Sequence, residues 1–164
     1  MMHVNLFDLD GVLCESPFTK LVKDNPNDLK EQFRIGKTPE FLAKLMGARK
    51  LSWYDENLKW ITDGEYCRMI VTGRYNHHEK VTKIWLDNNK IYYDFLVLQP
   101  YTDWNTYVKL RKNYVRLVVK NAKIDGKIVW YFEDNKTIYD WAKSFDPEFL
   151  KAYKITDGRL MKDE

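Results

Sequence analysis

Four short segments of the chain are apolar almost throughout, without the alternation of polar and apolar positions that a strand with one wet face shows. They are Val4–Phe7, Arg68–Thr72, Asp94–Leu98 and Lys127–Phe132. Strands that are buried on both faces of a parallel sheet have this pattern. We therefore predict four strands of a sheet that is covered on both sides.

Between these segments the apolar positions recur at helical spacing. Asn76, with Glu79 three residues later, matches a capping box at the start of one helix. Two further amphipathic helices are predicted, with apolar faces at Trp104, Val108, Val115 and Val118 and at Ile138, Trp141, Ala142 and Phe145. Alternating strands and helices predict an α/β fold, with a mostly parallel sheet flanked by helices.

Residues 14–65 interrupt this alternation. Thr38, followed by a proline at the first helical position, begins one helix that Gly47 is suited to end. Ser52 begins another helix, which we expect to end at Gly64. Because the segment follows the first strand directly, we predict that 14–65 is a small helical cap inserted into a single domain spanning 1–164. Asp157 and Gly158 predict a hairpin near the end of the chain.

Charge and cysteine content narrow the class of protein. The 27 Lys and Arg residues against 24 Asp and Glu residues give a net charge of +3, too mild for a protein that binds nucleic acid over its whole surface. Cys14 and Cys67 are too few for a disulfide framework, so we expect reduced thiols in a cytoplasmic protein. No apolar stretch approaches the roughly 20 residues of a membrane-spanning helix, and no membrane partner is expected.

Asp8 and Asp10 follow the first predicted strand and are the leading candidates for chemistry. Side chains at i and i+2 of a strand face the same way, so both carboxylates are expected on one side, with Leu9 in the core. At 4 Å they would repel by about 4 kcal/mol at an effective dielectric constant near 20, and a compensating charge is needed. The structural alternative is a solvated turn. A calcium loop is disfavoured because Val12–Cys14 supplies no further oxygen ligands.

Residues 6–13, with the sequence LFDLDGVL, resemble the first motif of the haloacid dehalogenase (HAD) superfamily. Three later segments resemble its other motifs in the expected order: Thr72 and Gly73 in the segment IVTGR, Lys109 in the basic helix, and Asp134 after the fourth strand. The resemblance implies a HAD-like Rossmannoid fold and phosphatase activity, with Thr72, Gly73 and Lys109 binding the phosphoryl group.

The chemistry of these residue types agrees with that implication. A carboxylate such as Asp8 can attack phosphorus and form an aspartyl-phosphate, while Asp10 serves as general acid and then as general base. Dehalogenases of the superfamily lack the second aspartate, so Asp10 favours phosphoryl transfer. The crowded negative charge calls for Mg²⁺, with Asp8, Asp134 and the backbone carbonyl of Asp10 as the expected ligands.

Two resemblances point to nucleic acid repair. Residues 133–141 are similar to the fourth motif of the phage polynucleotide kinase-phosphatase type, although Asn135 stands at its arginine position. The segments Ser16–Pro17 and Trp53–Glu56 are similar to the HAD domain of "Swiss Army Knife" RNA-repair proteins. They imply a polynucleotide 3′-phosphatase acting on DNA or RNA ends. A kinase phosphate loop is absent from the sequence, which excludes 5′-kinase activity.

Several side chains are candidate substrate contacts. Aromatic rings can stack on bases, and cations can follow a phosphate backbone. The candidates are Arg74, Trp53, Tyr54, Arg111 and Lys112. The alternative is that the rings are core residues and the charges form a solvated helix face. Two other functions stay open: a phosphatase for nucleotides or other small phosphorylated metabolites, and a non-catalytic HAD-fold binding module.

Overall fold

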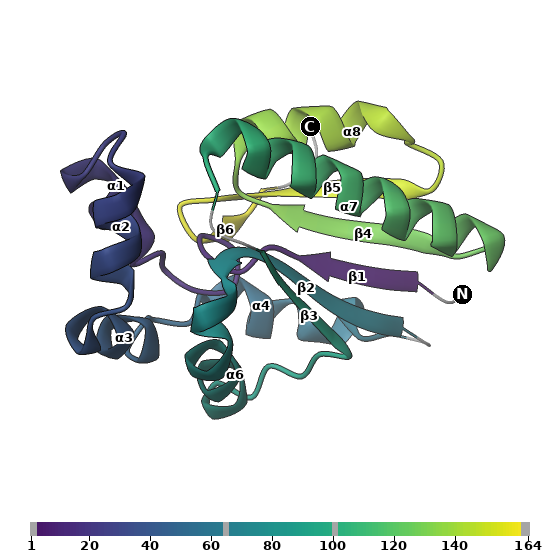
Figure 1. The fold of residues 1–164 in the computed structure, drawn as a ribbon. Helices are drawn as coiled ribbons and strands as arrows, with labels where there is room; N and C mark the ends of the chain where they lie inside the picture. The colour runs from purple at the N-terminus through teal and green to yellow at the C-terminus, as the bar shows by residue number, and fades with distance from the viewer. Residues whose placement is uncertain (1–2, 64–65, 100–101, 162–164) are drawn as a thin grey trace.

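A computed structural model describes residues 3–63, 66–99 and 102–161 of the chain. It contains a six-stranded sheet in the order β3-β2-β1-β4-β5-β6 (Figure 1). The strands are β1 (His3–Phe7), β2 (Tyr66–Tyr75), β3 (Phe95–Gln99), β4 (Ile128–Glu133), β5 (Leu150–Thr156) and β6 (Arg159–Leu160). All neighbouring strands pair in parallel except β5 and β6. The predicted, mostly parallel α/β sheet is confirmed.

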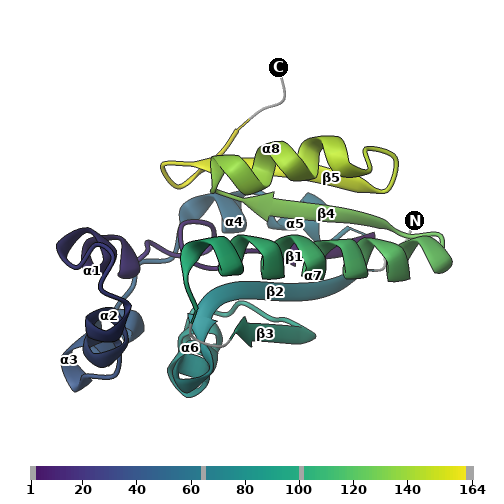
Figure 2. The same cartoon turned by 45° about the horizontal axis from the view of Figure 1, so that its top comes forward.

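Helices cover both faces of this sheet. The helices of the described residues are α1 (Phe18–Asp24), α2 (Leu29–Gly36), α3 (Pro39–Met46), α4 (Ser52–Glu56), α5 (Leu58–Ile61), α6 (Glu79–Asn88), α7 (Trp104–Ile124) and α8 (Lys136–Phe145), with a 3-10 turn η1 (Asn76–His78) before α6. Helices α7 and α8 lie on one face, and α4, α5 and α6 lie on the other (Figures 1 and 2). No helix in the described part of the chain is long and apolar enough to cross a membrane.

The two faces of the sheet have separate cores. Val4 and Leu6 of β1 join the apolar cluster under α7 and α8, whereas Phe7 joins the cluster on the side of α4 and α6. Every residue of β1 is buried, as expected for the central strand of a parallel sheet. The apolar pattern along the strands therefore reports burial on both faces.

The helices between β1 and β2 form two structural parts. Helices α1, α2 and α3 lie beyond the carboxyl ends of the strands (Figure 1) and share a small apolar cluster built on Leu21, Phe41 and Leu45. Helix α4 instead buries Trp53 and Tyr54 in the sheet core, at 2% and 1% exposure. Gly64, the predicted end of the second inserted helix, lies outside the described residues.

The sequence signals for the ends of helices and for the hairpin differed in accuracy. Thr38 caps α3 by accepting a hydrogen bond from the N–H of Phe41 at 3.2 Å, as predicted. Asp157 and Gly158 both have positive φ, which matches the hairpin between β5 and β6. The capping box at Asn76 is wrong: η1 begins there, and neither η1 nor α6 has a side-chain cap.

Candidate active site

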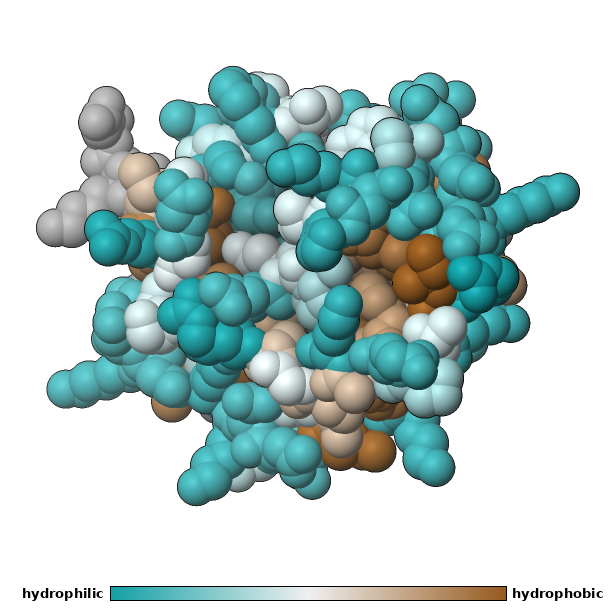
Figure 3. All heavy atoms as spheres, turned by 90° about the vertical axis from the view of Figure 1, so that its left-hand side faces the viewer, coloured by the Kyte–Doolittle hydropathy of each residue, from teal (hydrophilic) through white to brown (hydrophobic). Residues whose placement is uncertain are grey.

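The carboxyl ends of four parallel strands meet at one cavity of about 690 Å³. Asp8 follows β1, and Glu133 and Asp134 end β4 or follow it. Gly73 and Arg74 belong to the end of β2, where the register with β3 shifts between Val71 and Tyr75. Such irregularities re-aim side chains beside functional sites. The end of the molecule that carries α1–α3 is mostly hydrophilic, with hydrophobic patches between (Figure 3).

A tight loop presents Asp8 and Asp10 to this cavity. The N–H of Asp8 donates to the carbonyl of Phe132 at 3.1 Å, and Asp8 Oδ1 accepts from the N–H of Leu9 at 2.8 Å. Leu9 is fully buried and both carboxylates line the cavity, as predicted, but they do so from a loop and not from the strand, since β1 ends at Phe7. Gly11 has a φ of 82°, and a Cβ there would lie 2.1 Å from Asp134 Oδ2. Glycine is therefore required for the loop to approach Asp134.

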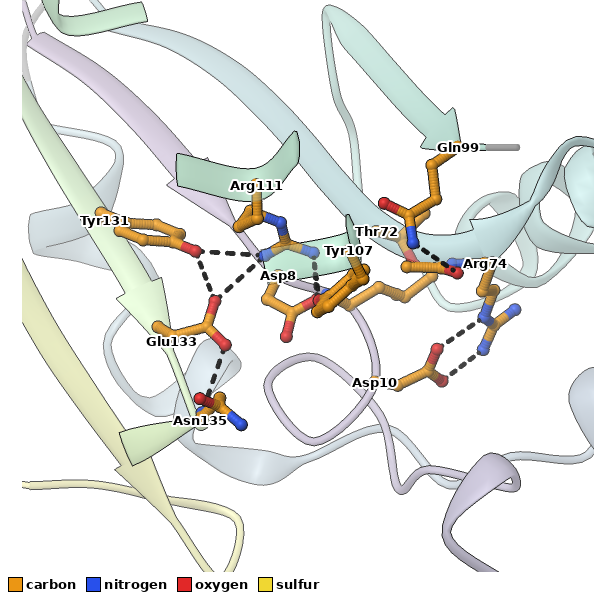
Figure 4. A network of polar contacts seen from close by, with 12 residues as sticks. Asp8, Asp10, Thr72, Arg74, Gln99, Tyr107, Arg111, Tyr131, Glu133 and Asn135 are labelled. Carbon is orange, nitrogen blue, oxygen red and sulfur yellow. Dashed lines mark hydrogen bonds and ion pairs between the residues drawn. The ribbon is translucent and has the colours of Figure 1, made fainter. Parts of the chain in front are cut away.

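Arg111 of α7 joins two buried carboxylates. Its Nη2 donates to Asp8 Oδ1 at 3.3 Å, and its Nη1 donates to Glu133 Oε2 at 3.0 Å (Figure 4). The hydroxyl groups of Tyr107 and Tyr131 also contact the guanidinium, at 2.9 and 3.1 Å. Burial opposes its charge, but these surrounding groups raise the pKa of Arg111 well above its ordinary value. Arg111 thus remains a cation beside Asp8.

Asp10 has its own cationic partner. Arg74 Nε and Nη2 donate to its two carboxylate oxygens at 2.9 and 2.8 Å (Figure 4). The same guanidinium contacts Thr82 Oγ1 at 3.0 Å and Cys14 Sγ at 3.6 Å, and Arg74 is only 1% exposed. The structure therefore places Arg74 behind Asp10, where it holds that carboxylate in place.

Thr72 and Cys14 are both buried near this pair. Thr72 is 1% exposed, and its hydroxyl accepts a hydrogen bond from the N–H of Arg74 at 3.1 Å. Burial, followed by the negative charge of Asp10, raises the pKa of the Cys14 thiol. Cys14 is thus a buried, neutral free thiol.

Other residues that were predicted to contact substrate lie away from the cavity. Lys109 is exposed and does not line the cavity; two residues along a helix correspond to a rotation of about 200°, so it faces nearly opposite to Arg111. Lys112 lies 5.7 Å from the ring centre of Trp141. Trp53 and Tyr54 are core residues. Their positions correct the expectation that Lys109, Lys112, Trp53 and Tyr54 contact substrate.

Three acidic residues form a cluster that fits a divalent metal ion. Asp8, Glu133 and Asp134 each offer an oxygen, and these atoms lie within 4.8 Å of one another. Burial, followed by repulsion from Asp8, raises the pKa of Asp134 to about 8. Burial and Asp8 also raise the pKa of Glu133, although Arg111 opposes the shift. A hard cation with oxygen ligands would relieve this charge.

The members of the cluster are not equivalent. Glu133 Oε2 already accepts hydrogen bonds from Arg111 and from Tyr131, and Oε1 accepts from the N–H of Asn135. Of the two acidic residues at the end of β4, Asp134 is therefore the better ligand. The carboxylate of Asp10 lies outside the cluster and is paired with Arg74.

Sequence reasoning missed the role of Arg111 beside Asp8. One signal was present: Val108, Arg111, Val115 and Val118 follow helical spacing, so Arg111 occupies a position on the apolar stripe of α7. A charged residue on a buried stripe needs a buried partner. Tyr107 and Tyr131 carried no such signal, because a tyrosine on an apolar stripe is an ordinary core residue.

Comparison with known proteins supports the fold. No protein-family model matches the chain, and no curated protein matches it. A chain in a structure of the Pnkp1/Rnl/Hen1 RNA repair complex is similar, with a TM-score of 0.59, 16% identity and coverage of 94% of this chain and 42% of that one. A chain in a second structure of the Pnkp1/Rnl/Hen1 complex has a TM-score of 0.58 and 17% identity, with coverage of 94% and 45%.

The HAD domain of effector protein Lem4 from Legionella pneumophila is also similar, with a TM-score of 0.52 and 11% identity; the match covers 96% of this chain and 88% of that one. This chain spans less than half the length of the chains it matches in the Pnkp1/Rnl/Hen1 structures. At these identities the likeness concerns the fold, and the chain has the fold of a HAD domain.

Proposed function

We propose that this HAD-fold chain is a phosphomonoester hydrolase whose nucleophile is Asp8. The observation that carries the proposal is the environment of Asp8 at the end of the central strand. Its carboxylate lies 3.3 Å from Arg111 and within a cluster of three acidic residues, and Asp10 lines the same cavity. This arrangement combines a nucleophile, a fixed cation, a second carboxylate and a metal-binding cluster.

The residues of the chain divide the reaction into two steps. Asp8 Oδ1 is held by Leu9 and Arg111, so Oδ2 is the oxygen that attacks phosphorus. The bond between phosphorus and the ester oxygen breaks, and Asp10 donates a proton to the leaving oxygen. Asp10 then takes a proton from water, which attacks the aspartyl-phosphate and releases inorganic phosphate. Arg74 holds Asp10 at the cavity through the ion pair, and one of the two hydrogen bonds has to open while Asp10 carries the proton.

Asp8, Asp134 and the backbone carbonyl of Asp10 would hold Mg²⁺. The ion supplies charge neutralisation and polarises the phosphoryl oxygens when bound. Thr72 and Gly73 are the proposed phosphate contacts: Gly73 lines the cavity, and the Thr72 hydroxyl retains a proton to donate. Arg111 is the cation of α7 that reaches Asp8, but it is buried and does not line the cavity, so its proposed role is to orient Asp8 and not to bind the phosphoryl group.

For the substrate we propose a phosphate at the 3′ end of a nucleic acid. Support comes from the motif resemblance and from the likeness to chains found in RNA repair complexes. A nucleotide or another small phosphorylated metabolite is the alternative. A non-catalytic binding module is disfavoured because both Asp8 and Asp10 are present and line the cavity.

The test uses a generic aryl phosphate with Mg²⁺. Asp8→Asn removes the nucleophile with little change in shape, and we expect the rate to fall by at least about a thousandfold. Chelation of the metal should also stop turnover. Asp87→Asn, an exposed aspartate on α6, is the matched control and should retain the rate. Undiminished turnover by Asp8→Asn would refute the covalent mechanism.

A further inference from the structure

Two stacked aromatic rings form part of the cavity wall at the start of α7. The ring centres of Trp104 and Tyr107 lie 5.3 Å apart, with 28° between their planes. Both residues line the same cavity as Asp8. Trp104 is 54% exposed, so the outer ring of the pair presents apolar area to solvent at the rim of the cavity. Exposed aromatic rings in binding sites supply flat surfaces for other rings.

Neighbouring groups support the helix turn that carries Trp104 and the ring of Tyr107. Asp103 caps α7 by accepting hydrogen bonds from the N–H and the hydroxyl of Thr106, at 2.9 and 3.0 Å, which fixes the turn that carries Trp104. A Cβ on Gly73 would lie 2.7 Å from Tyr107 Cε2, so the Tyr107 ring packs directly against the backbone of β2. A surface fixed in advance costs little conformational entropy when a ligand binds.

The pair is also linked to the reacting group. The Tyr107 hydroxyl accepts a hydrogen bond from Arg111 Nη2 at 2.9 Å, and the same Nη2 lies 3.3 Å from Asp8 Oδ1 (Figure 4). The inner ring is therefore one residue away from the nucleophile. The two rings and the nucleophile therefore line one cavity, so a substrate bound at Asp8 shares that cavity with the rings.

The remaining wall is poorly suited to a phosphate backbone. Among the described residues that line the cavity, Arg74 is the one cation, and its guanidinium is paired with Asp10. A protein binds along the phosphate backbone of a nucleic acid through Lys and Arg side chains, which replace the counterions of the phosphates. Asn27 and Asn105 line the cavity as well, and their amides can bond to base edges. This wall is therefore better suited to stacking on a base and hydrogen bonding to its edge than to binding a phosphate backbone.

We propose that Trp104, backed by Tyr107, is a stacking subsite for a nucleobase on the leaving group of the substrate. The inference rests on the proposed function and deepens it: the substrate is a nucleoside phosphate. The base belongs either to a free mononucleotide or to the last nucleotide of a strand, since both present the same ring next to the phosphate.

The kinetic test compares adenosine 3′-monophosphate with glycerol phosphate, which has no ring. For Trp104→Ala we expect the ratio of kcat/KM values between the two substrates to fall about tenfold, mainly through KM. Trp104→Phe keeps a ring and should retain most of the ratio. Tyr92→Ala is the control, since Tyr92 is 68% exposed and lies outside the cavity lining. If the ratio of the two kcat/KM values is unchanged in Trp104→Ala, Trp104 is not a stacking subsite.

A binding test separates this inference from the proposed function. Titration calorimetry measures the Kd of adenosine 3′-monophosphate for Asp8→Asn and for the double variant Asp8→Asn with Trp104→Ala. We expect about tenfold weaker binding in the double variant. Equal Kd values overturn the subsite. If the wild-type chain hydrolyses no ester but the Kd still rises, the proposed function fails and the subsite stands.

A third experiment tests whether the stacked base belongs to a free mononucleotide or to the end of a strand. A 3′-phosphorylated trinucleotide is compared with the same strand ending in an abasic nucleotide, and with the mononucleotide. Loss of activity on the abasic strand supports stacking of the terminal base, and equal activity on both strands overturns it for strand ends. A higher kcat/KM for the mononucleotide than for the trinucleotide, still dependent on Trp104, assigns the subsite to free nucleotides.

Discussion

Buried charges determine what single residues contribute to this site. Arg111 and Glu133 are 2% and 0% exposed, and their ion pair of 3.0 Å is surrounded by protein. Removing one partner of a buried pair leaves an uncompensated charge, which costs more than the pair itself contributes. Arg111 therefore stabilises the fold as well as orienting Asp8.

Arg111→Met keeps the length of the side chain and removes its charge. We expect the free energy of unfolding to fall by about 3–5 kcal/mol in urea titrations, because Glu133 and Asp8 lose their cation. Phosphatase activity should fall with it.

Lys109→Met is the matched variant on the other side of α7. Since Lys109 is exposed, we expect its unfolding free energy to change by less than about 0.5 kcal/mol. If Lys109→Met lost more activity than Arg111→Met, the proposal that Arg111 supports Asp8 while Lys109 is a solvated charge would be wrong.

At the residue scale, periodicity of side chains predicted more than residue type did. The spacing of Asp8, Leu9 and Asp10 predicted two carboxylates in the cavity and one core side chain, and the structure agrees. The types of Trp53 and Tyr54 suggested base contacts, yet these rings pack against Phe7 in the core. An isolated aromatic residue carries no information on which face of a short helix is buried.

At the scale of elements, α7 connects the site to the rest of the sheet. Its first turn carries Trp104 and Tyr107, and Arg111 follows Tyr107 about one turn later. Asp103 sets where this helix begins, since its carboxylate accepts from the N–H of Thr106. The hydrogen bonds from the backbone and side chain of Thr106 lower the pKa of Asp103, so the capping carboxylate stays ionised.

Asp103→Ala removes this cap. We expect the unfolding free energy to fall by about 1 kcal/mol in thermal or urea unfolding, whereas Asp103→Asn should stay within a few tenths, since asparagine caps helices about as well as aspartate. Equal destabilisation by both substitutions would contradict a capping role and would point to a need for the negative charge.

Element types were predictable where they are long or buried, and less so elsewhere. The apolar runs located β1 to β4 within a few residues, because double-sided burial leaves a continuous signal. The sequence did not predict α1 and α2 as separate helices. Helix α1 has seven residues and no side-chain cap, so it carries neither a long periodic pattern nor a start signal. The shift in register at the end of β2 has no local signature either.

At the scale of the molecule, His78 joins helices α1–α3 to the sheet domain. Its Nε2 lies 2.7 Å from the carbonyl of Gly36 at the end of α2, and its ring lies 5.6 Å from that of Phe18. His78 is fully buried in this contact. Burial, with the backbone bond to Gly36 opposing it, lowers the pKa of His78 to about 4.

This shift predicts a pH dependence of stability. Between pH 6.5 and about 4 the unfolded chain binds a proton at His78 that the folded chain does not, so stability is lost as the pH falls through this range. The loss attributable to His78 is about 3 kcal/mol. We expect urea titrations of His78→Phe to lack this component of the pH dependence.

His77→Phe is the control. Burial and then Lys37 also lower the pKa of His77, but His77 is exposed, so we expect its substitution to leave most of the pH dependence in place. The same pH dependence in wild type and His78→Phe would contradict the burial of a neutral His78 between α2 and η1.

The sequence predicted the overall architecture. It did not predict that, between β1 and β2, α4 would pack on the sheet while α1–α3 lie beyond it. The alternation of strands and helices predicted the parallel sheet, and the order of motifs predicted which strand ends meet. Whether a helix between strands packs on the sheet or beyond it depends on distant contacts, such as the hydrogen bond from Trp53 Nε1 to the carbonyl of Val12 at 2.5 Å. Residues 14–65 gave no local sign that α4 and α1–α3 would separate.

The central claim is that Asp8 accepts the phosphoryl group. Acid quenching of the wild-type chain during turnover of an aryl phosphate, followed by peptide mapping with mass spectrometry, tests it directly. We expect one phosphoryl group on Asp8 and none in the Asp8→Asn chain. Turnover with no phosphorylated Asp8, or with the phosphoryl group on another side chain, would contradict the account.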